Sequence, residues 1–198
     1  MTHTPFAPAA EAYAYPLLIK QLLHTPLAVA PEQEIVYRDS FRMNYRELAR
    51  RIGRLANALT RRGVGRGTTV AMLDWDSHRY LEAFFAVPMM GAVLQTVNIR
   101  LSPEQILYTL NHARAEVAIV HAEFVPMLAG IIDQLETVKT FILISDGGGE
   151  MAAFCIPFAG EYEALLAAES AEYSFHDFDE NTRATTFYTT GTTGLPKG

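Results

Sequence analysis

Hydrophobic residues along this chain follow two alternating spacings. Short apolar runs, typical of buried strands, are separated by longer segments in which apolar residues recur at helical spacing. This alternation indicates βαβ units, in which helices join parallel strands and cover both faces of a sheet. The sequence therefore predicts the α/β class, with a layered, mostly parallel β-sheet flanked by helices. The expected strands are 34–38, 69–73, 92–97, 116–121 and 140–145, and the expected helices are 16–23, 45–62, 77–90, 102 onward, 123–136 and 162–168.

Local signals set the expected ends of several helices. Ser102, Pro103 and Gln105 supply an N-cap, a first-turn proline and the third-position side chain of a capping box. Pro16 is expected to open a helix, because proline fits the first turn. The Thr-Pro pair at 25–26 is expected to interrupt that helix, because proline disfavours helix at the residue before it.

Changes in composition divide the chain into four expected parts. Residues 1–15 form an arm that is rich in Ala and Pro, and 16–146 form the α/β subdomain. Residues 147–182 form a connector with one short helix, and they contain eight acidic residues and no Lys or Arg. Residues 183–198 form a strand that runs into a Gly/Thr loop.

Composition narrows the classes of partner. The chain has 198 residues, of which 49% are hydrophobic and 19% are charged, so it can bury a core. Lys+Arg 16 against Asp+Glu 22 gives a net charge of −6, which argues against a general nucleic-acid binder. Cys155 is the single cysteine, which excludes an intrachain disulfide and fits a reducing, cytoplasmic location.

Neither a signal peptide nor a membrane span is expected in this sequence. The first residues lack the basic start and continuous apolar run of a signal peptide. The most apolar stretch, 80–97, contains Glu82 and Pro88 and reads as a buried helix followed by a strand. We therefore expect at most peripheral contact with a membrane.

Arginines are concentrated between positions 38 and 66, a range that contains nine arginines and only two acidic residues. Arg46, Arg50 and Arg54 are spaced to form one stripe along a helix. Such a stripe could bind anionic lipid or nucleic acid. We favour a solvated helix face, paired in part with the acidic connector, because neither interleaved aromatic residues nor a basic strand accompany this stripe.

The most informative segment is 189–198, Thr-Thr-Gly-Thr-Thr-Gly-Leu-Pro-Lys-Gly, which directly follows a predicted strand. Glycines let backbone N–H groups turn toward an anion, and Thr hydroxyls can donate to phosphate oxygens or ligate Mg²⁺. Lys197 would add a positive charge. The segment lacks the spacing of a Walker A loop and of a dinucleotide fingerprint. On these residues alone, the alternative to a phosphate loop is a plain Gly/Thr turn.

Other combinations of polar residues carry weaker signals. His121 and Glu123 match half of a zinc-deaminase motif, but no Pro-Cys-x-x-Cys accompanies them, so a strand end is expected. Asp74 and Asp76 are expected to cap the helix that begins near Ser77 rather than to bind a metal. The six histidines show no metal-ligand spacing.

The segment from Tyr188 to Gly198 resembles the signature phosphate loop of the acyl-adenylate-forming enzymes, which include acyl-CoA synthetases and peptide-synthetase adenylation domains. The order of Thr, Gly, Pro and Lys in this segment is specific. Segments farther upstream resemble the amino-terminal region of bacterial medium- and long-chain fatty-acyl-CoA synthetases. These segments are 45–59, 63–70, 78–98, 100–113 and 117–120.

The resemblance implies an enzyme that uses ATP and a carboxylate to form acyl-AMP and pyrophosphate, and then transfers the acyl group to CoA. It implies Mg²⁺ as the ion and a fatty acid as the carboxylate, with a short sulfur-containing or aryl acid as the alternative. It further implies that the loop holds the β- and γ-phosphates and that Thr189 lies at the metal. The implied phosphate-binding residues are Thr189, Thr190, Gly191, Thr192, Thr193, Gly194 and Lys197.

Members of this family continue well beyond the phosphate loop, and their adenine pocket and catalytic lysine come later in the chain. We therefore expect these 198 residues to be the front portion of an enzyme, with no catalytic residue of their own and little turnover alone. A second hypothesis is a non-catalytic nucleotide-binding or interaction module. A homodimer is a further expectation, since residues 1–15 could pack on a partner.

Overall fold

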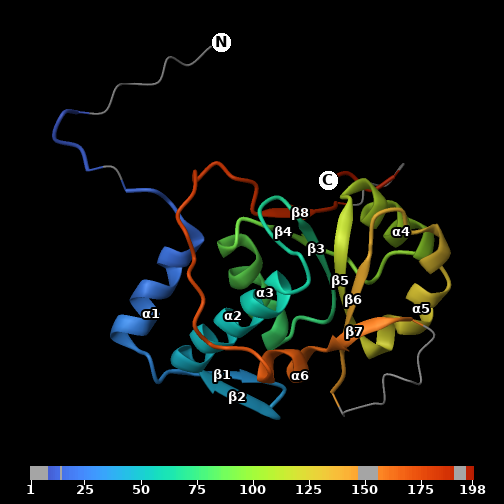
Figure 1. The fold of residues 1–198 in the computed structure, drawn as a ribbon, viewed down its shortest axis with the longest axis horizontal. Coiled ribbons are helices and arrows are strands. Elements are labelled where there is room, and N and C mark those ends of the chain that lie inside the picture. Colours follow the sequence, from blue (N-terminus) through green and yellow to red (C-terminus); the bar gives the residue numbers. More distant parts are fainter. Residues whose placement is uncertain (1–8, 14, 147–155, 190–194) are drawn as a thin grey trace.

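Six parallel strands form the central sheet of the computed structural model, which describes residues 9–13, 15–146, 156–189 and 195–198. The strands are β3 (Thr69–Leu73), β4 (Val93–Thr96), β5 (Ala115–His121), β6 (Thr140–Ile144), β7 (Phe158–Glu161) and β8 (Thr185–Phe187). They lie in the order β7-β6-β5-β3-β4-β8, and every neighbouring pair is parallel (Figure 1). The predicted fold class, an α/β protein with a mostly parallel sheet, is confirmed.

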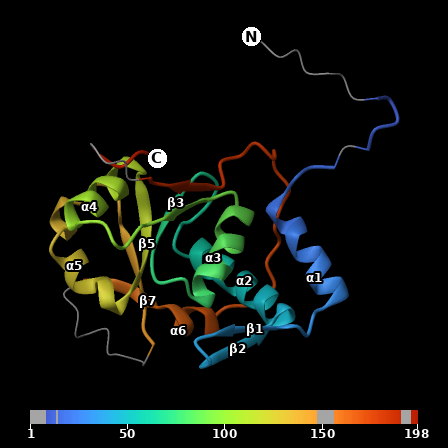
Figure 2. The ribbon, with the colours of Figure 1, turned by 180° about the vertical axis from the view of Figure 1, so that it is seen from behind.

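Helices cover both faces of this sheet (Figures 1 and 2). One face carries α2 (Tyr45–Thr60), α3 (His78–Met89) and α6 (Tyr162–Ala167), and the other carries α4 (Pro103–His112) and α5 (Val125–Ala129). Alternate residues of β3 pack against the two helical layers, because successive side chains of a strand point to opposite faces of the sheet. Val70 and Met72 join the first layer, whereas Ala71 and Leu73 join the second. No helix in the described ranges is long and apolar enough to cross a bilayer.

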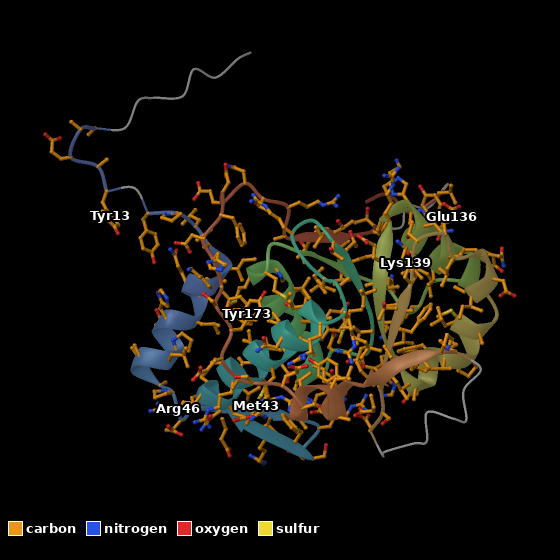
Figure 3. The ribbon with its side chains drawn as sticks, in the orientation of Figure 1. Tyr13, Met43, Arg46, Glu136, Lys139 and Tyr173 are labelled. Carbon is orange, nitrogen blue, oxygen red and sulfur yellow. The ribbon has the colours of Figure 1, made fainter. Side chains whose placement is uncertain are left out.

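Before β3, the chain forms two short helical segments and a β-hairpin. The helical turns η1 (Ile19–Leu23) and α1 (His24–Val29) come first, followed by the strands β1 (Glu34–Tyr37) and β2 (Phe41–Asn44). The two strands pair antiparallel. Figure 3 shows Tyr13 on the extended segment before η1, away from the sheet, and this residue is 86% exposed.

Several local predictions are wrong. Pro16 does not open a helix, because the first helical turn, η1, begins at Ile19. The Thr-Pro pair at 25–26 lies inside α1 instead of interrupting a helix, because Pro26 falls in the first turn, where no intrahelical N–H bond is lost. The helix expected over 123–136 is broken into η2 (Ala122–Phe124), α5 and η3 (Ile132–Gln134). Gly130 ends α5, and glycine is among the poorest helix formers. Strand β7 was not predicted, and it forms where the edge of β6 offers a partner.

Two residues of the arginine stripe on α2, Arg46 and Arg50, are exposed, whereas Arg54 is half-buried. Arg46 pairs with Glu32 at 2.5 Å. Arg50 and Arg54 both approach Glu47, at 3.6 and 3.9 Å. The acidic connector is paired instead through other arginines of the helix and its end, and Arg61 bonds Glu169 at 2.7 Å.

The connector after α6 packs closely along α2 before it reaches β8, and Figure 1 shows its path between α1 and α3. Asn57 Nδ2 donates to the carbonyl oxygens of Ser170 and Glu172, both at 2.9 Å. The backbone passes so near Gly53 that an added Cβ would lie 2.0 Å from the Ala171 carbonyl oxygen. A glycine is therefore required at this position of α2.

A buried ionic cluster joins α2, α3 and α6. Arg51 Nε donates to Glu82 Oε1 at 2.7 Å, and the Glu82 side chain is fully buried. The Tyr162 hydroxyl donates to the second Glu82 oxygen at 2.7 Å. Glu163 accepts from Arg51 at 2.9 Å and from Arg79 Nε at 3.0 Å. Each carboxylate in the cluster therefore has a guanidinium partner.

Burial and pairing have opposite effects on the two carboxyl groups. Burial raises the pKa of Glu82, although the neighbouring Arg51 guanidinium opposes that rise. Burial alone would also raise the pKa of Glu163, but the contacts with His78, Arg51 and Arg79 outweigh it and bring this pKa to about 2. Of the two carboxyl groups, Glu163 is therefore the one that holds its charge more firmly.

Replacing the tightly packed glycine tests the contact between α2 and the connector. Gly53→Ala should lower the free energy of unfolding by about 2 kcal/mol, because overpacking outweighs the better helix propensity of alanine. Gly65→Ala is the matched control, since nothing lies within 4 Å of a Cβ there. Its effect should stay within about 0.5 kcal/mol in urea unfolding. Equal stability of the two variants would contradict the close approach of the connector.

The depressed pKa of Glu163 predicts a pH dependence of stability. The carboxylate contributes stability that is fully present above its ordinary pKa of 4.5 and is lost as the pH falls toward about 2. Glu163→Gln should therefore be less stable than the parent at neutral pH and should lose less stability on acidification. Urea unfolding across this range measures both slopes, with Asp133→Asn as a charge-matched surface control. Parallel slopes for parent and Glu163→Gln would refute the assignment.

Candidate functional site

The carboxyl ends of the parallel strands meet at one edge of the sheet, the edge at which open α/β sheets bind ligands. Five polar residues follow or end these strands at that edge. They are Asp74 after β3, Asn98 after β4, His121 at the end of β5, Asp146 after β6 and Tyr188 after β8. The edge thus gathers polar side chains from segments far apart in the sequence.

A cleft of about 490 Å³ lies among the ends of β3, β4 and β8. Its walls combine carboxylates, an arginine, an amide and aromatic rings, so it suits a polar ligand with an apolar part. It is lined by Asp74, Trp75, Asp76, Tyr80, Thr96, Val97, Asn98, Ile99, Arg100, Phe187 and Tyr188. The loop 98–100 was not singled out as part of a site, because only the parallel pairing of β4 with β8 brings it beside Tyr188.

Asp74 supports the start of α3 indirectly. Ser77 is the N-cap, and its Oγ accepts from the backbone N–H groups of Arg79 and Tyr80 at 3.2 and 3.4 Å. The Ser77 hydroxyl in turn donates to Asp74. Burial raises the pKa of Asp74, and the bond from Ser77 opposes that rise. The expectation that Asp74 and Asp76 cap this helix is therefore wrong, because the shorter Ser77 side chain occupies the capping position.

His121 ends β5, as the sequence predicts. Its Nδ1 accepts from the Glu123 N–H at 3.3 Å, while its Nε2 lies 3.3 Å from Asp146 Oδ2. Arg79 also donates to Asp146, at 2.9 Å. Burial alone would raise the pKa of Asp146, but the contacts with Arg79 and His121 outweigh burial, so this pKa lies below its ordinary value. Across the described ranges, no group of three or more His, Cys, Asp or Glu side chains is placed to hold a metal ion.

The segment predicted to bind phosphate is described at its two ends. The Thr189 N–H donates to the Lys197 carbonyl oxygen at 2.9 Å, and the Lys197 N–H donates to the Thr189 carbonyl oxygen at 3.0 Å. This reciprocal pair closes the base of the segment. The other predicted residues, Thr190, Gly191, Thr192, Thr193 and Gly194, lie outside the described residues.

A second cleft, of about 540 Å³, runs beside β8 and this base. Its basic side chains and hydroxyls suit an anionic group. It is lined by His112, Ala113, Arg183, Thr185, Thr186, Phe187, Tyr188, Thr189, Lys197 and Gly198. The structure thus brings together Thr189 and Lys197, two of the residues predicted to bind phosphate. It places beside them His112 and Arg183, which the sequence did not point to.

Comparisons with known proteins agree with the fold and with this segment. A profile of the AMP-binding enzymes matches residues 23–198. A 3-methylmercaptopropionyl-CoA ligase of Ruegeria lacuscaerulensis is 37% identical over 187 residues, which are 92% of this chain and 34% of that protein. A long-chain-fatty-acid–CoA ligase of Thermus thermophilus is 38% identical over 180 residues, which are 89% of this chain and 31% of that protein.

A solved structure has the same arrangement of elements. The crystal structure of an anthranilate CoA ligase in complex with anthranoyl-AMP superimposes with a TM-score of 0.80 at 25% identity. The match covers 89% of this chain and 33% of that one, so the chain spans about a third of the length of the relatives that it matches. The matched profile, the identity to curated ligases and the shared fold place this chain in the family of AMP-binding enzymes.

Proposed function

We propose that this chain carries the phosphate-binding segment of an ATP-dependent, AMP-forming acid–CoA ligase. The observation that carries the proposal is the segment 189–198, which directly follows β8 and is closed at its base by the Thr189–Lys197 pair. Membership in the AMP-binding enzymes supports the nucleotide, and the CoA ligases among the relatives support the acceptor.

The proposed reaction has two steps. A carboxylate oxygen attacks the α-phosphorus of ATP, the bond to the pyrophosphate oxygen breaks, and acyl-AMP forms. The CoA sulfur then attacks the acyl carbon and AMP leaves with the bonding electrons. Neither step needs a nucleophile from the protein, so the main tasks of the chain are positioning and charge neutralisation.

The residues at the base fit a polyphosphate. Lys197 and Thr189 are both exposed, and they present a positive charge and a hydroxyl to the second cleft. A hydroxyl oxygen is a hard donor of the kind that Mg²⁺ accepts, so we propose Thr189 for the ion, which would neutralise phosphate charge. The phosphate contacts are proposed for Thr189, Thr190, Gly191, Thr192, Thr193, Gly194 and Lys197.

We propose a medium- or long-chain fatty acid as the carboxylate. The ligase from Thermus thermophilus supports this choice at 38% identity. A short sulfur-containing acid is the second candidate, because the ligase from Ruegeria lacuscaerulensis matches 92% of the chain at 37% identity. We further propose a cytoplasmic location, in line with the single cysteine, and a homodimer held by residues 1–15.

Carboxylate-dependent exchange between ATP and pyrophosphate tests the reaction in the full-length gene product. We expect exchange that is strongest with acids of medium or long chain, in a series from acetate to palmitate that includes 3-methylthiopropionate and benzoate. The 198-residue chain alone should give little or none. Exchange that peaks at 3-methylthiopropionate would select the second substrate. No exchange with any acid would refute the ligase and favour a non-catalytic nucleotide-binding module.

Removing the positive charge of Lys197 tests the proposal that the segment 189–198 binds phosphate. Lys197→Ala should lower the exchange rate about tenfold or more, because one charged contact to the developing phosphate charge is lost. Lys139→Ala is the matched control, since this exposed lysine, labelled in Figure 3, directly precedes β6 and lines neither cleft. Equal rates in the two variants would contradict the assignment.

A further inference from the structure

One hydrogen bond joins the entrance of the 189–197 segment to a helix far away in the sequence. The Tyr188 hydroxyl lies 2.8 Å from His112 Nδ1, and the two residues are 76 positions apart. Their rings meet edge to face, with centroids 5.8 Å apart and planes at 77°. Tyr188 directly precedes Thr189, so the contact acts on the first arm of the segment.

The ring of Tyr188 also contacts the second arm. An added Cβ on Gly198 would lie 2.6 Å from Tyr188 Cε1, so the glycine backbone packs directly against this ring. Thr189 and Lys197 form their reciprocal backbone pair one residue inside this contact. Tyr188 therefore lies between His112 and the far end of the segment, and both arms of the base depend on its position.

His112 is itself attached to a well-fixed helix. The capping box of Ser102 and Gln105 starts α4, and Gln95 Nε2 of β4 donates to the Thr109 carbonyl oxygen at 3.1 Å. Next to His112, Asn111 donates to the Gln134 carbonyl oxygen and accepts from the Glu136 N–H, both at 3.0 Å. The last turn of α4 is thus tied both to the sheet and to the segment after α5.

The bond between the two side chains can form in either protonation state of the imidazole. A neutral ring with its proton on Nε2 accepts a hydrogen bond from the phenol hydroxyl at Nδ1, and a protonated ring donates from Nδ1 to the phenol oxygen. Tyr108 stacks on the ring of His112, with centroids 5.3 Å apart and an interplanar angle of 23°. Burial raises the pKa of Tyr188, and the nearby Tyr108 adds to that rise, so the phenol keeps its proton.

We propose that His112 is a positioning residue that anchors the phosphate-binding segment to α4 through the Tyr188 hydroxyl. This inference rests on the proposed function for its effect on ATP, whereas the anchoring itself does not. Without the anchor, Tyr188 is free to leave Gly198, and the base formed by Thr189 and Lys197 loses its support. ATP binding should then weaken, while binding of the carboxylate should change little.

Two substitutions at position 112 separate the hydrogen bond from the bulk of the ring. His112→Leu removes the bonding nitrogen and keeps an apolar side chain of similar reach. His112→Asn restores a polar atom close to the place of Nδ1, because both atoms are bonded to Cγ. His24→Leu is the matched control, since His24 is an exposed histidine at the start of α1, outside both clefts.

Amide hydrogen exchange of the full-length protein measures the anchoring directly. His112→Leu should speed exchange at the Thr189 and Lys197 amides about three- to tenfold, the range set by one hydrogen bond of ordinary strength. His112→Asn and His24→Leu should stay within about twofold of the parent. Unchanged exchange in His112→Leu would overturn the proposal.

Steady-state kinetics of ATP–pyrophosphate exchange measures the consequence. His112→Leu should raise the KM for ATP about three- to tenfold and leave the KM for the carboxylate nearly unchanged, and His112→Asn should restore the KM for ATP. Equal damage in the Leu and Asn variants, with a matching fall in Tm, would show a merely structural role and overturn the proposal. If the parent shows no ATP–pyrophosphate exchange, the proposed function fails, and the amide data still decide the anchoring.

Discussion

The ion pair between Arg51 and Glu82 is the interaction on which the helical layer of this protein depends. Both side chains are almost fully withdrawn from water, at 9% and 0% exposure. Such a pair adds little net stability compared with apolar residues, but removing one partner costs about 3–5 kcal/mol, because the other charge is left buried. The pair therefore contributes more to the relative position of α2 and α3 than to the free energy of their packing.

The same cluster determines the path of the chain toward the site. Tyr162 and Glu163 bring α6 onto the cluster, and the connector leaves α6 along α2, where Gly53 lets its backbone pass. Lys20 pairs with Asp177 on the way. The connector then delivers β8 to the free edge of β4 in parallel register. The path that starts at this buried charge pair thereby ends at a three-residue strand, from which the proposed phosphate-binding segment continues.

The charge distribution also agrees with a polyphosphate at this end of the molecule. The chain carries a net charge of −6, and much of its acidic excess is in the connector, where arginines of α2 and α3 neutralise part of it. Arg183 and Lys197 line the cleft beside β8. A local positive potential on an acidic protein attracts an anionic ligand without making the whole surface adhesive to nucleic acid.

Features that depend on residues close together in the chain could be predicted from the sequence. The capping box at Ser102 and the apolar run of β3 are short-range patterns, and each predicted its element correctly. The order of residues in 189–198 is also a short-range pattern, and the phosphate binding that it implies is a proposal. Tertiary structure decided the rest. Strand β7 exists because β6 offers a partner. His112 meets Tyr188 only after β8 has paired with β4, and no periodic pattern in the sequence links residues 76 positions apart.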